Sequence, residues 1–292
     1  VYFAYVIKSK SDHLILLNAN MYLSDNNIDG VLITDADLKV YYVNKAFEKF
    51  YGYSLSELYR KTPFEVIGEY GIDIHRDIKE KHQSFETHVW NKTKNGIRIL
   101  KYLRIKNEVT PSGRTRHYIG IYSEPIYELE DYLKYSLTKE ETIGELSKVF
   151  IKYPFVLGKT TLFMIKTFNH NGFDLAKYLS TQLNQKFILA IPKKNYLMIY
   201  YTGESKIDST IDLLDRLIDQ YRHLSTTDRS FSHIFAICQS DETNKDYQSM
   251  IEALLITIEL SKRDPRVKHH IYHHSMREVI DREFQIQQQL EH

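Results

Sequence analysis

The chain has 292 residues, of which 42% are hydrophobic and 26% charged, a composition typical of folded proteins that excludes a disordered or fibrous one. The length predicts two domains. Lysine plus arginine number 39 and aspartate plus glutamate 38, so no global field would attract nucleic acid. No apolar run is long enough to span a membrane. The single cysteine, Cys238, excludes an internal disulfide and fits a cytoplasmic location.

Residues 1–22 are predicted to form an N-terminal helix or linker, because apolar side chains recur at helical spacing within residues 5–24. The chain starts with a valine and has no initiator methionine. Residues 290–292, Leu-Glu-His, resemble the beginning of a purification tag. We therefore expect a piece of a longer protein that ends in a tag remnant.

A first domain is predicted over residues 23–125. Its apolar runs at residues 31–34 and 39–43 are separated by a turn and predict a β-hairpin. Ser54 and Glu57 have the spacing of a capping box at the start of a short helix. The predicted helices cover residues 44–51 and 54–59, and the predicted strands that follow cover residues 84–93, 97–106 and 115–122.

Several short segments of this domain resemble a PAS domain. They are Ile33-Thr34-Asp35, Tyr42 to Phe47, Gly52-Tyr53-Ser54, Glu57-Leu58, Lys94-Asn95-Gly96 and Tyr118 to Ile121. The resemblance implies an antiparallel sheet packed against helices. In this fold we expect Asn44 to hydrogen-bond backbone at the end of the hairpin, and Val43 and Phe47 to face the core.

PAS families hold haem, flavin or another small molecule between sheet and helices, or nothing, and the fold alone does not choose among these. The first domain lacks a cysteine, which argues against covalent flavin photochemistry. The residues expected to line a ligand cavity are Val43, Phe47, His75, Trp90 and Tyr102.

A haem would need a histidine that points inward as its axial ligand. Solvent exposure is the simpler interpretation of each histidine here. In the same way, an aromatic residue on a strand is more often core than cavity lining. The candidate axial ligands are His75, His82 and His88.

A connector helix is predicted over residues 126–150, where Ile126, Leu129, Leu133 and Leu137 have helical spacing. We expect this helix and the N-terminal helix to mediate a homodimer. A second domain, an α/β sandwich, is predicted over residues 151–274 because strands alternate with helices there. Its predicted strands cover residues 160–167, 187–191, 196–201 and 231–239, and its predicted helices cover residues 173–183, 206–224 and 247–261.

The order of these elements resembles the GGDEF domain of diguanylate cyclases. In that family the central hairpin carries two glycines and then acidic residues that bind magnesium. The first strand should also end near a metal-binding aspartate, but residues 165–169, Ile-Lys-Thr-Phe-Asn, contain none. The resemblance therefore implies a degenerate, catalytically inactive domain. The hairpin positions are occupied by Lys193, Lys194, Asn195, Tyr196 and Leu197.

The second domain contains two further groups of residues that could bind a ligand, one for phosphate and one for zinc. Lys193, Lys194 and Lys262 would contact phosphate if the degenerate domain still bound GTP, although a solvated basic turn is the simpler interpretation. Residues 269–274 contain four histidines, but no acid or cysteine lies near them to complete a zinc site. No metal site is therefore predicted.

The helix predicted at residues 275–289 resembles the segment that leads into an EAL domain. The resemblance implies a bacterial cyclic di-GMP signalling protein of the PAS-GGDEF-EAL type, with the EAL-like partner domain downstream and the full-length protein a phosphodiesterase. The present chain is expected to be non-enzymatic, with PAS sensing or dimerisation coupled through the connector to the degenerate domain. Two alternatives stay open, which are a GTP-binding or residually active diguanylate cyclase and a pure dimerisation scaffold.

Overall fold

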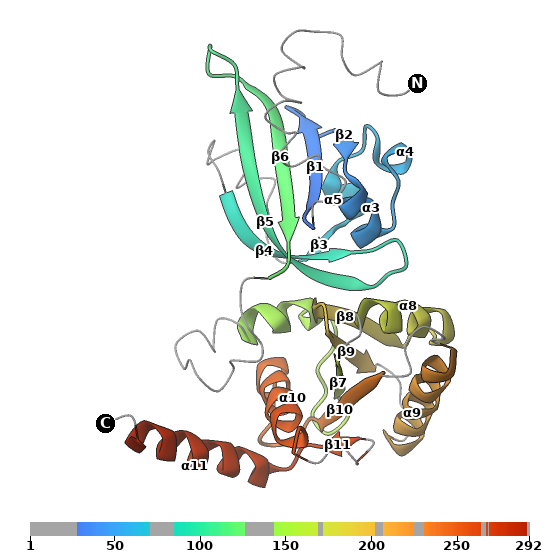
Figure 1. The fold of residues 1–292 in the computed structure, drawn as a ribbon, viewed down its shortest axis with the longest axis vertical. Helices are drawn as coiled ribbons and strands as arrows, with labels where there is room; N and C mark the ends of the chain where they lie inside the picture. Colours follow the sequence, from blue (N-terminus) through green and yellow to red (C-terminus); the bar gives the residue numbers. More distant parts are fainter. Residues whose placement is uncertain are drawn as a thin grey trace. The chain divides into compact units, whose positions relative to one another are not determined.

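The computed structural model describes residues 28–70, 85–125, 143–168, 172–201, 207–224, 231–263, 267 and 269–290. The predicted N-terminal helix and most of the predicted connector lie outside these residues. The chain divides into two compact units (Figure 1). The first unit comprises the described residues up to Lys94 together with Lys101–Glu124, and the second comprises Asn95–Leu100 together with the described residues from Pro125 onward.

The first unit is built on one sheet in which the strands lie in the order β2-β1-β6-β5-β4-β3 (Figure 1). β1 pairs antiparallel with both β2 and β6, and β6 pairs antiparallel with β5. The sequence patterns predict each of these strands except the short β3. The strands are β1 (Gly30–Asp35), β2 (Val40–Val43), β3 (Gly68–Tyr70), β4 (Phe85–Lys92), β5 (Arg98–Val109) and β6 (Thr115–Ser123).

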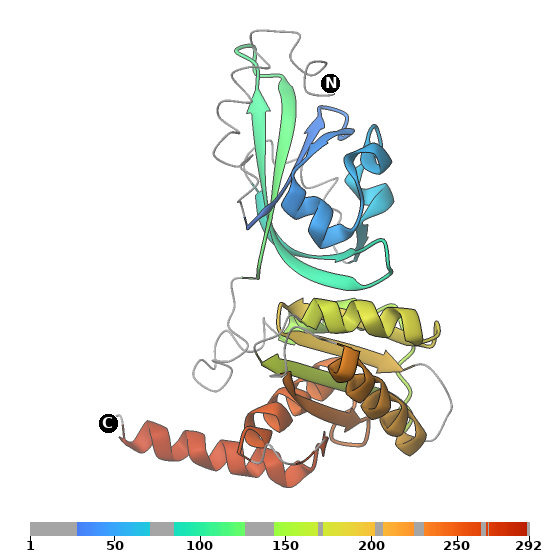
Figure 2. The same cartoon turned by 45° about the vertical axis from the view of Figure 1, so that its right-hand side comes forward.

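The described helices of this unit, α3 (Lys45–Tyr51), α4 (Leu55–Leu58) and α5 (Pro63–Val66), lie on one face of the sheet (Figure 2). α3 ends at Gly52, which has a φ of 75° and donates its N–H to the carbonyl of Glu48. Glycine adopts this left-handed conformation without steric cost. The chain can therefore turn directly from α3 into α4, and the helices predicted at residues 44–51 and 54–59 are confirmed.

Alternation along the strands decides which side chains face the helices. A Cβ added to Gly30 would lie 3.2 Å from the Cα of Phe47 in α3, so Gly30 faces the helices. Gly30 pairs in register with Tyr122, which therefore faces the same way. The opposite face of β1 and β6 is apolar and buried, and it consists of Val31, Ile33, Ile119 and Ile121.

The buried side chain of Asn44 joins the sheet to α3. Its Oδ1 accepts hydrogen bonds from the backbone N–H groups of Val31 and Phe47, both at 2.9 Å. Its Nδ2 donates to the carbonyl of Asp29 at 2.9 Å. The predicted role of Asn44 is thereby confirmed. One carboxamide caps α3 and fixes the start of β1 at the same time.

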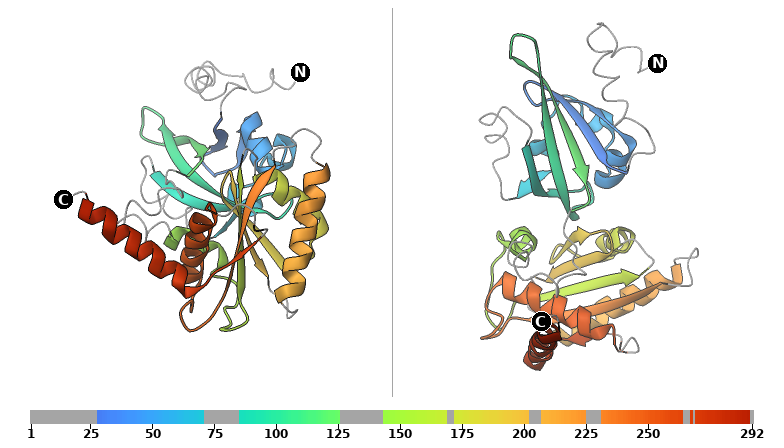
Figure 3. Two further views of the ribbon diagram at one scale, coloured as in Figure 1. Left: turned by 60° about the horizontal axis from the view of Figure 1, so that its bottom comes forward. Right: turned by 60° about the vertical axis from the view of Figure 1, so that its left-hand side comes forward.

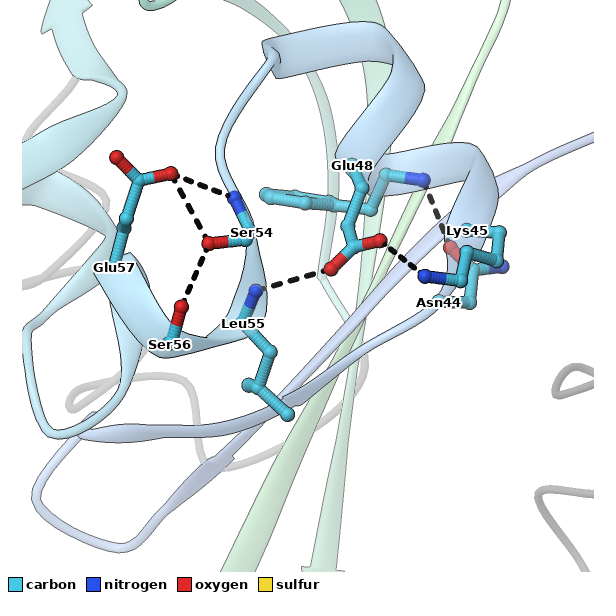
Figure 4. Close-up of polar contacts among 8 residues, drawn as sticks. Asn44, Lys45, Glu48, Ser54, Leu55, Ser56 and Glu57 are labelled. Atoms are coloured by element: carbon cyan, nitrogen blue, oxygen red, sulfur yellow. Dashed lines mark hydrogen bonds and ion pairs between the residues drawn. The ribbon is translucent and has the colours of Figure 1, made fainter. Parts of the chain in front are cut away.

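Polar contacts also tie α3 to α4 (Figure 4). Oε1 of Glu48 accepts the N–H of Leu55 at 3.1 Å, so a side chain of α3 satisfies a backbone donor in the first turn of α4. Oε2 of Glu57 accepts the N–H of Ser54 at 3.0 Å, as the capping-box spacing predicts. The two short helices therefore form one hydrogen-bonded pair.

In the second unit the strands lie in the order β11-β10-β7-β9-β8. Helices α8 (Gly172–Gln182) and α9 (Ile207–Leu224) lie on one face of this sheet, and α10 (Tyr247–Ser261) lies on the other (Figure 3). The strands and helices predicted for this region are confirmed, and β11 is an addition. The strands are β7 (Thr161–Phe168), β8 (Phe187–Lys193), β9 (Tyr196–Tyr201), β10 (Ser232–Gln239) and β11 (His270–Ile271).

Most side chains of α10 between Met250 and Ile258 are buried, and they point to all sides of the helix. The sheet covers one side of it, and α11 (His274–Leu290) contacts another side through Met276 and Arg277. Residues 143–150, which the sequence assigns to the connector, belong to the second unit, because their apolar side chains are buried there. Among the described helices, none combines the length and apolar character of a membrane span.

We predict that Asn44→Ala destabilises the first unit by about 2 to 4 kcal/mol, because two buried N–H donors and one carbonyl lose their partner. Chemical denaturation of the intact chain measures this loss. Thr62→Ala is the matched control, since Thr62 caps the exposed start of α5 and its removal should cost about 1 kcal/mol or less. Equal losses in the two variants would contradict the role assigned to Asn44.

Burial, helped by the charge of Arg222, lowers the pKa of His233 in β10 from 6.5 to about 4. The folded unit keeps this histidine neutral, whereas the unfolded chain binds a proton below its ordinary pKa. We therefore expect the free energy of unfolding to fall by up to about 3 kcal/mol as the pH drops through this window. Denaturation series at several pH values measure this loss. His233→Gln should make the free energy of unfolding less dependent on pH, whereas His223→Gln, on the exposed end of α9, should not.

Candidate functional site

Three aromatic rings meet between α3 and the sheet of the first unit. The ring centroids of Phe47 and Tyr51 lie 4.5 Å apart, and that of Tyr122 on β6 lies 5.3 Å from Phe47 and 5.7 Å from Tyr51. All three side chains are buried. Edge-to-face and tilted contacts of this kind stabilise an aromatic cluster beyond the burial of its area. The cluster marks the interior in which a PAS ligand would have to be bound.

The interior also contains a short polar chain. The hydroxyl of Tyr51 donates to Oδ1 of Asn91 at 2.9 Å, and Nδ2 of Asn91 donates to the carbonyl of Ile67 at 3.2 Å. Burial raises the pKa of Tyr51 well above its ordinary value, with further contributions from Tyr122 and from the charge of Glu124. The phenol is therefore neutral at physiological pH and acts as a hydrogen-bond donor.

The structure separates the residues predicted to line a cavity. Val43 pairs in register with Leu32 and faces the interior together with Phe47. Tyr102 pairs with Ser123, which neighbours the inward Tyr122, so Tyr102 lies on the opposite face of the sheet.

Trp90 neighbours the inward Asn91 on β4 and by the same alternation also lies on the opposite face. Trp90 and Tyr102 therefore do not point into the space between sheet and helices. His75 and His82 lie outside the described residues. The aromatic type of Tyr51 and Tyr122 was visible in the sequence, but their inward orientation needed the strand register.

The described part of the first unit offers no histidine that faces this interior. His88 lies two residues from Trp90 on the same face of β4, and its ring packs against Tyr102 at a centroid distance of 5.2 Å. His117 on β6 pairs in register with Asp35 and binds the hydroxyl of Tyr41 through Nδ1 at 3.0 Å. Both histidines are on the face that points away from the helices. Within the described residues, no histidine is therefore placed to bind a haem in this interior.

An ion pair lies at the end of β6, where the chain leaves the sheet. Nζ of Lys101 on β5 lies 2.5 Å from Oε1 of Glu124 and 4.0 Å from the ring centroid of Phe50 on α3. The Lys101 side chain is only 7% exposed, whereas that of Glu124 is 40% exposed. The ammonium is therefore held between an aromatic face and one carboxylate, both of which stabilise its charge. This pair could not be predicted from the sequence, because neither residue belongs to a motif.

In the second unit, the structure brings the predicted hairpin positions next to the end of β7. The N–H of Thr167 donates to the carbonyl of Asn195 at 2.9 Å, and the N–H of Gly172 donates to the carbonyl of Lys194 at 2.8 Å. A Cβ on Gly172 would lie only 3.2 Å from that carbonyl oxygen. The turn backbone is thus joined to β7 through the carbonyl of Asn195 and to the start of α8 through the carbonyl of Lys194.

A buried lysine occupies the end of β7. Lys166 pairs in register with Tyr196 and is 3% exposed. Its ammonium lies 5.4 Å from the ring centroids of both Phe168 and Tyr196. Two electron-rich ring faces stabilise a buried cation, and a fixed positive charge at this place repels a divalent metal ion.

The remaining candidates of the second unit are engaged in local pairs. Lys262 forms an ion pair with Glu259 one turn earlier on α10. Nδ1 of His269 lies 3.0 Å from Oδ2 of Asp215 on α9. Within the described residues, no group of three or more histidine, cysteine, aspartate or glutamate side chains is arranged to hold a metal ion.

Comparison with known proteins identifies the first unit. The family model described as PAS fold matches residues 23–122, close to the predicted boundaries of 23–125. The match ends before Pro125, so the second unit lies outside it except for Asn95–Leu100. No curated protein matches the chain.

Solved structures that resemble the chain include an RNA-binding light-oxygen-voltage receptor, with 19% identity and a TM-score of 0.33 over 40% of this chain and 34% of the receptor. A PAS domain from Colwellia psychrerythraea has 17% identity and a TM-score of 0.33, covering 37% of this chain and 94% of that domain. A LOV domain from a blue-light activated histidine kinase of Erythrobacter litoralis has 22% identity and a TM-score of 0.29, covering 32% and 92%. The chain spans about a third of the length of the RNA-binding receptor.

Proposed function

Because residues 23–122 form a PAS domain, we propose that this chain is a regulatory module of bacterial cyclic di-GMP signalling. In this proposal the PAS domain senses a small molecule or redox state, or dimerises, and the second unit is a GGDEF-like domain without catalytic activity. The observation that carries the inactive assignment is the buried Lys166 beside the β8–β9 turn.

The arrangement of the second unit supports the GGDEF-like interpretation. Its elements follow one another in the chain as β7, α8, β8, β9, α9, β10 and α10. This is the same order of strands and helices on which the resemblance to the GGDEF family is based. The β8–β9 hairpin lies next to β7 in the sheet, so the turn and the end of β7 are adjacent. In an active member of the family, the metal-binding acids would come from these two places.

Charge argues against nucleotide chemistry at this place. A divalent ion held against a triphosphate needs carboxylates, which supply both negative charge and oxygen ligands. Here the turn carries Lys193 and Lys194, and the end of β7 carries Lys166. Two turn carbonyls already accept hydrogen bonds from β7 and the start of α8. In this proposal the second unit therefore acts as a structural link between the PAS domain and a downstream EAL-like domain, which would carry any enzymatic output.

The test is to incubate the whole chain with GTP and magnesium and to analyse the products by chromatography. We expect no cyclic di-GMP, because no acid at the turn holds the metal. Thermal unfolding should be unchanged by GTP. A GTP-dependent stabilisation that is lost in Lys193→Ala/Lys194→Ala would establish a binding-only domain, and turnover above that of heat-denatured protein would sink the proposal.

The PAS interior is tested by the absorbance of the freshly purified chain between about 350 and 450 nm, where haem and flavin absorb. We expect no haem band, because the described histidines of this unit face away from the interior. A band that disappears in His88→Ala but persists in the matched variant His117→Ala would contradict the orientation assigned to β4.

A further inference from the structure

Lys101 holds two different elements of the first unit through one ammonium group. Its partner on one side is the ring of Phe50 in α3, and its partner on the other side is Glu124, which follows the last residue of β6. The side chain is nearly buried, so few water molecules are available to replace a lost partner. A buried charge that loses its partner is strongly destabilised. Both contacts must therefore be kept together.

The place of these contacts connects the interior to the chain exit. Phe50 directly precedes Tyr51 of the interior cluster in α3, and a Cβ on Gly30 would lie 3.0 Å from its ring. Glu124 is followed by Pro125, the last described residue before the second unit's segment at 143–150. The charge of Glu124 also contributes to the raised pKa of the interior Tyr51. The Lys101–Glu124 pair thus lies between α3 and the segment by which the chain leaves the PAS domain.

We propose that Lys101 is a positioning residue that couples α3 to the C-terminal end of β6. When α3 shifts, the aromatic face no longer holds the Lys101 side chain beside Glu124, so the ion pair breaks more often. The end of β6 then opens more often. The idea that this coupling transmits a sensory signal rests on the proposed sensing role of the PAS domain. The coupling between α3 and β6 itself does not depend on that role.

Among the other Lys–Glu pairs of the first unit, Lys94–Glu57 serves as a control. Nζ of Lys94 lies 2.5 Å from Oε1 of Glu57, the same distance as in the Lys101 pair, but its side chains are 50% and 39% exposed. Water can replace either partner there, so an exposed pair of this kind contributes little. The two pairs therefore have the same chemistry and distance but differ in burial.

The test is a double-mutant cycle read by backbone hydrogen exchange at residues 121–124 of the intact chain. Phe50→Leu removes the aromatic face and should speed this exchange about tenfold in the native background. In a Lys101→Met background the same change should add less than about twofold, because the link is already broken. In the Lys94→Met background the full effect should persist, and Lys101→Arg should retain it.

Two results overturn the coupling. One is an effect of Phe50→Leu that is equal in the native and Lys101→Met backgrounds, and the other is no effect in the native background. If Lys101→Met fails to fold, Glu124→Gln breaks the same ion pair from its more exposed side and completes the cycle. The experiment uses neither nucleotide nor ligand, so its failure is distinct from a failure of the GTP test.

Discussion

The three hydrogen bonds of the Asn44 carboxamide are the interaction on which the first unit depends. They bind the start of β1 and the start of α3 to the same side chain, which sets α3 over one face of the sheet. Phe47 and Tyr51 are then placed against Tyr122, and the same helix carries Phe50 to the ammonium of Lys101. The interior cluster and the contact at the chain exit both follow from one buried polar group, because a short helix has little else to fix its position.

In the second unit the corresponding constraint is electrostatic. The end of β7 and the β8–β9 turn are adjacent in the sheet, and at this place the chain has a buried lysine and a turn with two more lysines. The local backbone is satisfied by internal hydrogen bonds, as buried peptide groups require. The positive charge of these lysines disfavours a divalent metal ion at this place.

The hydrophobic centre of the second unit is α10, and the segments that cover it come from both ends of this part of the chain. Residues 143–150 precede the first strand and contact the first turn of α10, where the ring centroids of Phe150 and Tyr247 lie 5.6 Å apart, and α11 follows the last strand. Arg277 of α11 forms an ion pair with Glu252 of α10 at 2.6 Å, and Arg263 binds Glu283 through two bonds of 2.8 and 2.7 Å. A displacement of either covering segment would expose apolar surface of α10, so the entering and leaving segments are energetically linked to one helix.

Periodicity and local hydrogen-bonding preferences, which neighbours in the chain encode, were enough to predict most of the strands and helices, the bonding of Asn44 to backbone at the end of the hairpin, and the absence of acids at the β8–β9 turn. The sequence could not decide which face of a strand points to the helices, and so it placed Trp90 and Tyr102 in the interior instead of Tyr51, Asn91 and Tyr122. It also could not find the Lys101–Glu124 pair, or the attachment of residues 143–150 to α10. These depend on strand register and on contacts between distant segments, which only the tertiary structure sets.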